Sequence, residues 1–154
     1  MLPSPLDQIR VLQESYSATS LPARNIRHAL EEYTAKSGVF LGAREITWIT
    51  GRTIDLRGGV CVAAPTVNLL AVETLKLGVG DGSDPFQFFA SSQLSIGADE
   101  VYIGKVLLHR APPSVTLSCN RVTFLSPSGI PHPLVDVVKR WATNPEMEIE
   151  QVDE

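Results

Sequence analysis

The 154-residue sequence predicts a mainly β, short single-domain parallel β-helix with amphipathic helices at its N- and C-terminal ends. From Val39 onward apolar residues alternate with polar ones, the pattern of short β-strands. The apolar pairs also recur at an offset of 21 residues, which is typical of a chain that coils and stacks each turn on the next. Two to four residues separate the strands, too few for intervening helices, so the βαβ class is excluded.

The 21-residue offset runs through the whole predicted body, residues 39–125. It links Ile46/Trp48 to Val67/Leu69, Ile54/Leu56 to Leu75/Leu77, Val67 to Phe88, Leu75 to Ile96, Leu94/Ile96 to Val115/Leu117, and Val101/Ile103 to Val122/Phe124. An antiparallel β-sandwich is the alternative, because it also uses short alternating strands. Hairpins do not require a fixed offset, and no Asn-Gly or Asp-Gly turn joins two clear strands, so the β-helix is favoured.

Residues 1–38 predict an N-terminal helical cap. Ser4 as N-cap and Pro5 as the first helical residue predict a helix over 5–16. A second helix is predicted over 22–36, ended by a glycine. Its apolar stripe has the i, i+3, i+4, i+7 spacing and consists of Ile26, Ala29, Leu30 and Tyr33.

Residues 126–145 predict a proline-rich connector followed by a C-terminal helix over about 133–143. The helix has the same apolar spacing, formed by Leu134, Val137, Val138 and Trp141. Helices at both ends are interpreted as caps, because an uncovered strand edge invites pairing with another chain. The acidic residues of 146–154 predict a mobile, solvated tail.

Composition restricts the partners and the compartment. The formal net charge of −4 gives no electrostatic footprint for nucleic acid, so none is expected as a partner. Neither a signal peptide nor an apolar run of about 18 residues occurs, which predicts a cytoplasmic protein without membrane insertion. Cys61 and Cys119 fall on opposite sides of their strands, so no disulfide is expected.

Candidate chemical sites are sparse. Asp81 and Asp84 lie in a protruding loop and are oxygen ligands of the kind that Ca²⁺ prefers, but two carboxylates are better explained as an acidic turn. No zinc spacing, phosphate-binding glycine loop or nucleophile elbow is present, so no catalytic, metal or cofactor residue is predicted. Outward charges could form a polysaccharide-cleaving face, although a ladder of surface ion pairs is favoured. These charges are Asp55, Arg57, Lys76 and Asp99.

The sequence therefore favours a non-enzymatic scaffold or adaptor in a larger assembly, binding a protein partner or associating with itself. The predicted partner-binding residues are Phe89, Trp141, Asp81 and Asp84. By strand parity Phe86 and Phe88 point inward and Phe89 outward. Two alternatives remain: a carbohydrate-binding or carbohydrate-cleaving β-helix, and a cytosolic regulatory binder that uses its acidic tail.

The periodicity of residues 39–125 resembles that of parallel β-helix proteins as a class. The class includes the bactofilins, whose short solenoids polymerise end to end, and the larger pectate-lyase-like enzymes. The chain lacks the regular glycine pattern of the former and the length and calcium-acid cluster of the latter. The resemblance implies the fold alone, and no functional residue is carried over from either family.

Overall fold

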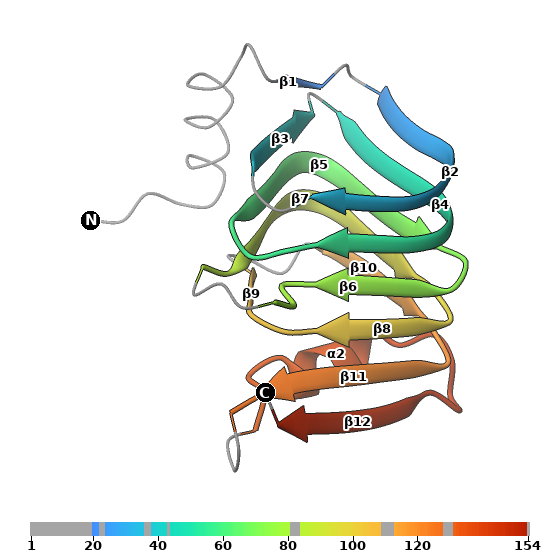
Figure 1. The fold of residues 1–154 in the computed structure, drawn as a ribbon, viewed down its shortest axis with the longest axis vertical. Helices are drawn as coiled ribbons and strands as arrows, with labels where there is room; N and C mark the ends of the chain where they lie inside the picture. The colour runs from blue at the N-terminus through green and yellow to red at the C-terminus, as the bar shows by residue number, and fades with distance from the viewer. Residues whose placement is uncertain are drawn as a thin grey trace.

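The computed structural model describes residues 20–21, 24–35, 38–42, 44–80, 84–108, 113–127 and 131–153. The described chain is mainly β with one short helix. All of its paired strands run parallel, so the antiparallel sandwich alternative is wrong. The curled, all-parallel sheet in Figure 1 is compatible with the predicted β-solenoid.

The elements of the described chain follow in a simple order. They are β1 (Ser20–Leu21), β2 (Arg24–Ala35), β3 (Gly38–Gly42), β4 (Glu45–Leu56), β5 (Val60–Ala71), β6 (Thr74–Leu77), β7 (Phe86–Gly97), β8 (Glu100–Ile103), β9 (Val106–Leu108), β10 (Ser114–Ser118), β11 (Arg121–Ser126), α2 (Val135–Trp141) and β12 (Glu148–Asp153). Strands β4, β5 and β7 each turn a corner, so their two halves pair with different neighbours. The chain therefore winds in circuits.

Three parallel ladders result from this winding. Ladder one contains β2, the first half of β4, the second halves of β5 and β7, and β10. Ladder two contains the ends of β2 and β4, then β6, β8, β11 and β12, and it lies on the near side in Figure 1. Ladder three contains β1, β3, the first halves of β5 and β7, and β9.

The hydrophobic core fills the space enclosed by the ladders. Equivalent residues of successive circuits stack in columns, such as Ile54, Leu75, Val101 and Val122 of ladder two, all fully buried. Phe40 and Trp48 meet edge to face inside it, with ring centroids 5.3 Å apart. Burial of each such side chain contributes about 1.5 to 3 kcal/mol, so these columns dominate the stability of the fold.

The register departs from one fixed offset. The offset is 21 between Ile54 and Leu75 and between Val101 and Val122, as predicted. The predicted links of Val67 to Phe88 and of Leu75 to Ile96 are wrong, because Val67 pairs with Leu94 and Leu75 with Val101. Extra residues between β6 and β7, and a bulge in the β5/β7 pairing, lengthen this circuit.

Tight corners join ladders two and three. Gly78 has φ +67°, a conformation that glycine adopts at little cost. Its N–H donates to the Leu56 carbonyl at 2.8 Å, and its own carbonyl accepts from the Lys105 N–H at 2.9 Å. A Cβ atom at Gly78 would overlap the Lys105 carbonyl oxygen, so this corner of the stack requires glycine.

The helix predicted over 22–36 is wrong, because residues Arg24–Ala35 form strand β2. Register irregularities between Arg27 and Leu30 and between Leu30 and Glu32 interrupt its pairing with β4, so its apolar residues mimic a helical stripe. Pairing along twelve residues overrides that weak local preference. Tyr33 lies 21 residues before Ile54 and pairs with it, a signal that the helical interpretation ignored. The helix predicted over 5–16 lies outside the described residues.

The C-terminal helix is confirmed as α2, which covers the last circuit of the core. Val138 is fully buried, and Leu134, Val137 and Trp141 pack against the core around it. The connector is held by His132, whose Nδ1 accepts the Leu134 N–H at 3.1 Å. Its Nε2 therefore carries the proton and donates to the Gly104 carbonyl at 2.7 Å.

The tail predicted as mobile and solvated is instead ordered. Residues Glu148–Asp153 form β12, which pairs parallel with β11. The Glu148 N–H donates to the Asn120 carbonyl at 2.9 Å, and Ile149 continues the inward column below Val122. The acidic side chains alternate with Met147, Ile149 and Gln151, so one face of the segment can pack while the charges stay in water.

Candidate functional site

The predicted partner-binding residues do not form one surface. Phe89 points away from the main core as predicted, but it is 5% exposed and packs in a second buried cluster with Leu41, Cys61 and Ala63. Trp141 is partly buried against the core from α2. Asp84 is exposed in the loop before β7, and Asp81 lies outside the described residues. The structure therefore does not bring these residues together.

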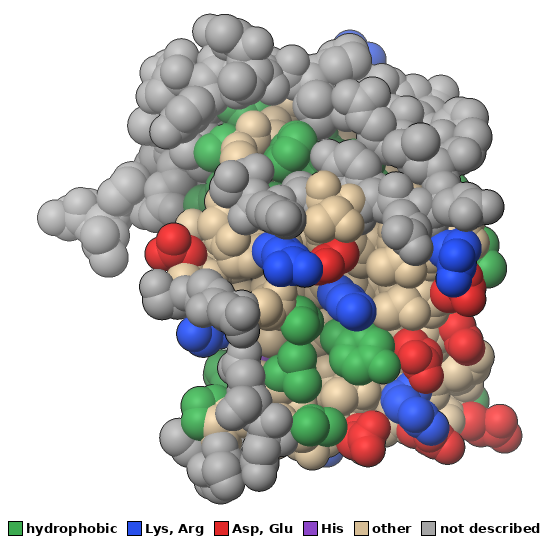
Figure 2. All heavy atoms as spheres, in the orientation of Figure 1, with side chains coloured by type: hydrophobic (Ala, Val, Ile, Leu, Met, Phe, Trp, Pro, Cys, Tyr) green, Lys and Arg blue, Asp and Glu red, His purple; other side chains and the backbone are tan. Residues whose placement is uncertain are grey.

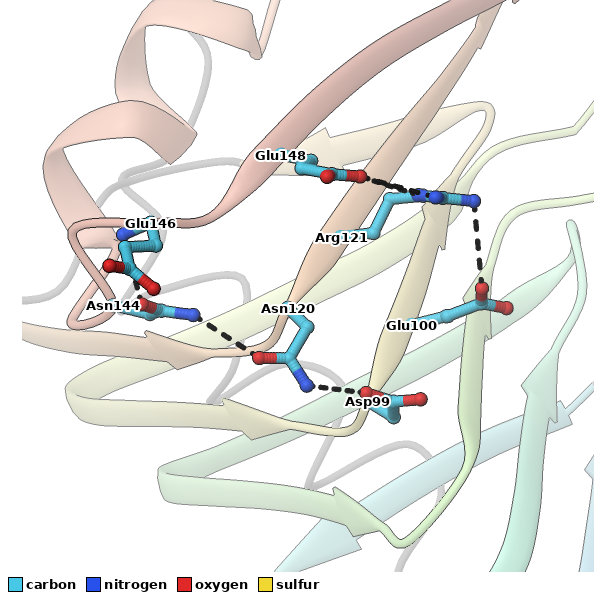
Figure 3. Close-up of a pocket in the computed structure, with 7 residues that line it drawn as sticks. All are labelled: Asp99, Glu100, Asn120, Arg121, Asn144, Glu146 and Glu148. Atoms are coloured by element: carbon cyan, nitrogen blue, oxygen red, sulfur yellow. Dashed lines mark hydrogen bonds and ion pairs between the residues drawn. The ribbon is translucent and has the colours of Figure 1, made fainter.

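A different group of polar side chains does converge, at the corner where ladder one passes into ladder two (Figure 3). It lines a hollow of about 280 Å³ and consists of Asp99, Glu100, Asn120, Arg121, Asn144, Glu146 and Glu148. We call this group, together with the neighbouring Glu150 of β12, the acidic corner. Stacking explains the convergence, because Glu100, Arg121 and Glu148 occupy the same register position in β8, β11 and β12.

Two chains of interactions organise the acidic corner, as Figure 3 shows. Arg121 donates from Nε and a terminal nitrogen to Glu148 Oε2 at 3.2 and 3.1 Å, and another terminal nitrogen lies 3.8 Å from Glu100 Oε1. Asn144 donates to Asn120 Oδ1 at 3.3 Å, and Asn120 donates to Asp99. Hydrogen bonding to Glu148 raises the pKa of Arg121, so this guanidinium stays charged.

Negative charge is concentrated at this corner, visible in Figure 2 as red side chains around one blue one at the lower right. The acidic members are Asp99, Glu100, Glu146, Glu148 and Glu150, and Arg121 is the basic member. Together they carry a formal charge of −4, which equals the net charge of the whole chain. Elsewhere the acidic and basic side chains cancel, so this corner is the negatively charged end of the protein.

Strand β12 brings apolar surface to the same end. Ile149 is 40% exposed and Val152 41%, whereas the residues above Ile149 in its column are fully buried. Within the described residues, β11 is the one strand that pairs with β12. The stack therefore ends in a strand whose outer edge, inward column and flanking carboxylates all lie at the surface.

The outward charges of the polysaccharide hypothesis are only partly brought together. Asp55 and Lys76 are register partners in ladder two, and Lys76 Nζ lies 5.9 Å from the centroid of the Tyr102 ring. Arg57 pairs with Asp55 at 3.4 Å, whereas Asp99 lies in the acidic corner. Surface pairs of this kind contribute about 0 to 1 kcal/mol each. They form a ladder of ion pairs, as favoured.

The two cysteines are free and buried, and they lie in different clusters, as the strand parity predicts. Desolvation raises the pKa of both thiols from near 9 to about 11, and Asp99 adds to the shift at Cys119. Across the described residues, no three His, Cys, Asp or Glu side chains are grouped so as to hold a metal ion.

We expect both thiols to react slowly with a disulfide reagent at pH 8, because burial disfavours the thiolate. Two thiols per chain should react at once in guanidinium. A folded pKa raised above the unfolded one means that the stabilising contribution is complete below pH 9 and is lost as the pH rises toward 11. An exposed control, Thr116→Cys, should react within the mixing time. Equally fast reaction of the native protein would contradict the burial of these thiols.

Comparison with known proteins found no match to any family model, curated protein or solved structure. In the part of the chain that the structure describes, no helix has the length and apolar character needed to cross a bilayer. The functional interpretation therefore depends on the geometry of the chain itself.

Proposed function

We propose that this chain is a β-solenoid module that acts as a non-enzymatic scaffold or adaptor in a larger protein assembly. The observation that carries the proposal is the C-terminal end of the stack, where β12, its exposed apolar side chains and the acidic corner form one surface. Half-exposed apolar residues rimmed by charged ones are typical of protein interaction sites.

The ladders support a scaffold role. Each circuit contacts the next through parallel backbone pairing and stacked side chains, so the body holds its surfaces in fixed positions. Side chains on the outer faces also link successive circuits, as when Asn68 donates to Thr47 Oγ1 at 3.1 Å and Arg52 pairs with Glu73 at 2.8 Å. A rigid body with a chemically distinct end is suited to positioning a partner.

The acidic-tail alternative merges with this proposal, since the acidic residues of the tail belong to β12 and to the acidic corner.

We expect the chain, purified from its native host at physiological salt, to elute with a mass above the 16.7 kDa of one copy and with a defined stoichiometry. Light scattering coupled to size-exclusion chromatography measures the mass, and cross-linking identifies the contacting chain. An unfolded control, Leu75→Asp, should lose the complex. Recovery of the folded chain as a monomer at every concentration tested would overturn the proposal.

A further inference from the structure

We propose that the outer edge of β12 binds an extended segment of a partner protein in which Lys or Arg alternates with aliphatic residues. The partner segment adds one more strand to ladder two. This inference rests on the proposed function and specifies the chemistry of the partner.

The backbone of β12 is directed suitably for such pairing. The Glu148 N–H bonds to the Asn120 carbonyl, so it faces β11. Backbone groups of successive residues in a parallel strand face alternate neighbours, and those of Ile149 therefore face away from β11. Figure 1 shows β12 as the last strand of the stack. An extended peptide that adds to such an edge gains affinity from main-chain hydrogen bonds.

The inward column defines one side of the partner strand. Val101 and Val122 are fully buried because the next circuit covers them, whereas Ile149 below them is 40% exposed. A strand added beneath β12 places every second side chain in this column. Aliphatic residues at those positions cover Ile149 and continue the core by one step.

The outward column defines the other side. Glu148 and Glu150 are exposed on β12, and the rest of the acidic corner lies beside them. Lys or Arg at alternate positions of the partner strand lies next to these carboxylates, where opposite charges on adjacent strands stabilise pairing. Arg121 compensates Glu148 and Glu100 in part, which leaves the corner with a net charge of −4.

A second copy of this chain fits the edge poorly. Two β12 strands paired antiparallel in the symmetric register place Glu148 opposite Asp153 of the other copy. Stacking of one molecule on the first circuit of the next continues ladder two and places Glu148 against Glu32, which shares its register position. Like charges directly opposite each other are destabilising. A basic partner avoids both conflicts.

The test titrates the full isotope-labelled chain with the hexapeptide acetyl-Lys-Val-Lys-Val-Lys-Val-amide and follows backbone amide shifts. We expect saturable binding with the largest changes at Ile149 and Glu150. The acidic analogue with Glu in place of Lys should bind at least about tenfold more weakly. A third peptide keeps the charges but is N-methylated at its valines, and it should lose binding because its edge cannot pair.

The matched protein variants are Glu150→Lys and Asp84→Lys, which make the same charge change at the edge and far from it. We expect Glu150→Lys to weaken the basic peptide about tenfold and to strengthen the acidic one, and Asp84→Lys to change neither by more than about twofold. Equal binding of the basic and acidic peptides, undiminished binding of the methylated peptide, or shifts remote from β12 would each overturn the inference. Such a failure leaves the proposed function standing if the complex from the host persists, and that function falls only with the mass measurement.

Discussion

Replacing Leu75 by aspartate is expected to abolish cooperative folding of the chain. Leu75 is fully buried in ladder two, with Ile54 above it and Val101 below. A carboxylate at this position has no partner in an apolar column, and an uncompensated buried charge costs about 3 to 5 kcal/mol. The variant also loses the burial of leucine, so the total approaches the whole stability of about 5 to 15 kcal/mol of a typical domain. Circular dichroism and a urea titration measure the loss.

The matched control for this prediction is Thr74→Asp, one residue earlier on the same strand. Thr74 lies on the outer side of ladder two, between Thr53 and Glu100. The new carboxylate stays in contact with water and meets one like charge, so a loss below about 1 kcal/mol is expected. Leu75→Ala should lie between the two, at about 2 to 5 kcal/mol. Equal behaviour of both aspartate variants would mean that the inward and outward sides of this strand are misassigned.

Gly78→Ala is expected to destabilise the protein by more than about 2 kcal/mol, although it adds a single methyl group. The backbone at Gly78 has φ +67°, and the added carbon overlaps the carbonyl oxygen of Lys105, which is main chain and cannot rotate away. That carbonyl accepts the Phe86 N–H at 2.9 Å at the start of β7. A shift of Lys105 therefore disturbs the pairing of β7 with β9.

Gly97→Ala is the control for the corner. A Cβ at Gly97 meets the Leu70 side chain at 3.1 Å, which is flexible and half-exposed, so a loss below about 1 kcal/mol is expected. Thermal denaturation of both variants distinguishes them. A Gly78→Ala protein as stable as Gly97→Ala would show that the two circuits do not approach each other closely at this corner.

Alternation and repetition predicted much of the fold, and the reason is physical. Inward residues such as Ile54 and Leu75 are stacked directly, so the repeat of the fold is written into the apolar pattern. The pattern could not give the register across the longer circuit, because extra residues between β6 and β7 change the offset without changing the alternation. Nor could it separate strand from helix in β2, whose irregular pairing mimics helical spacing.

The acidic corner was missed for a related reason. Its residues come from three separate turns that approach each other only through the stacking of circuits. One signal was present, since Asp99 precedes Asn120 and Glu100 precedes Arg121 by 21 residues. The contribution of β12 was obscured because its charges suggested a solvated tail. Alternation of Ile149 with Glu148 and Glu150 would have suggested a strand.

The longer circuit between β6 and β7 has a consequence for how this protein can change. Thr74 and Glu100 are register partners 26 residues apart, whereas the pairs above and below, Thr53 with Thr74 and Glu100 with Arg121, are 21 apart. Chain length at this one bend is thus decoupled from the alignment of neighbouring rungs. Insertions acquired in evolution, or a foreign epitope grafted by an engineer, have a tolerant place to reside there.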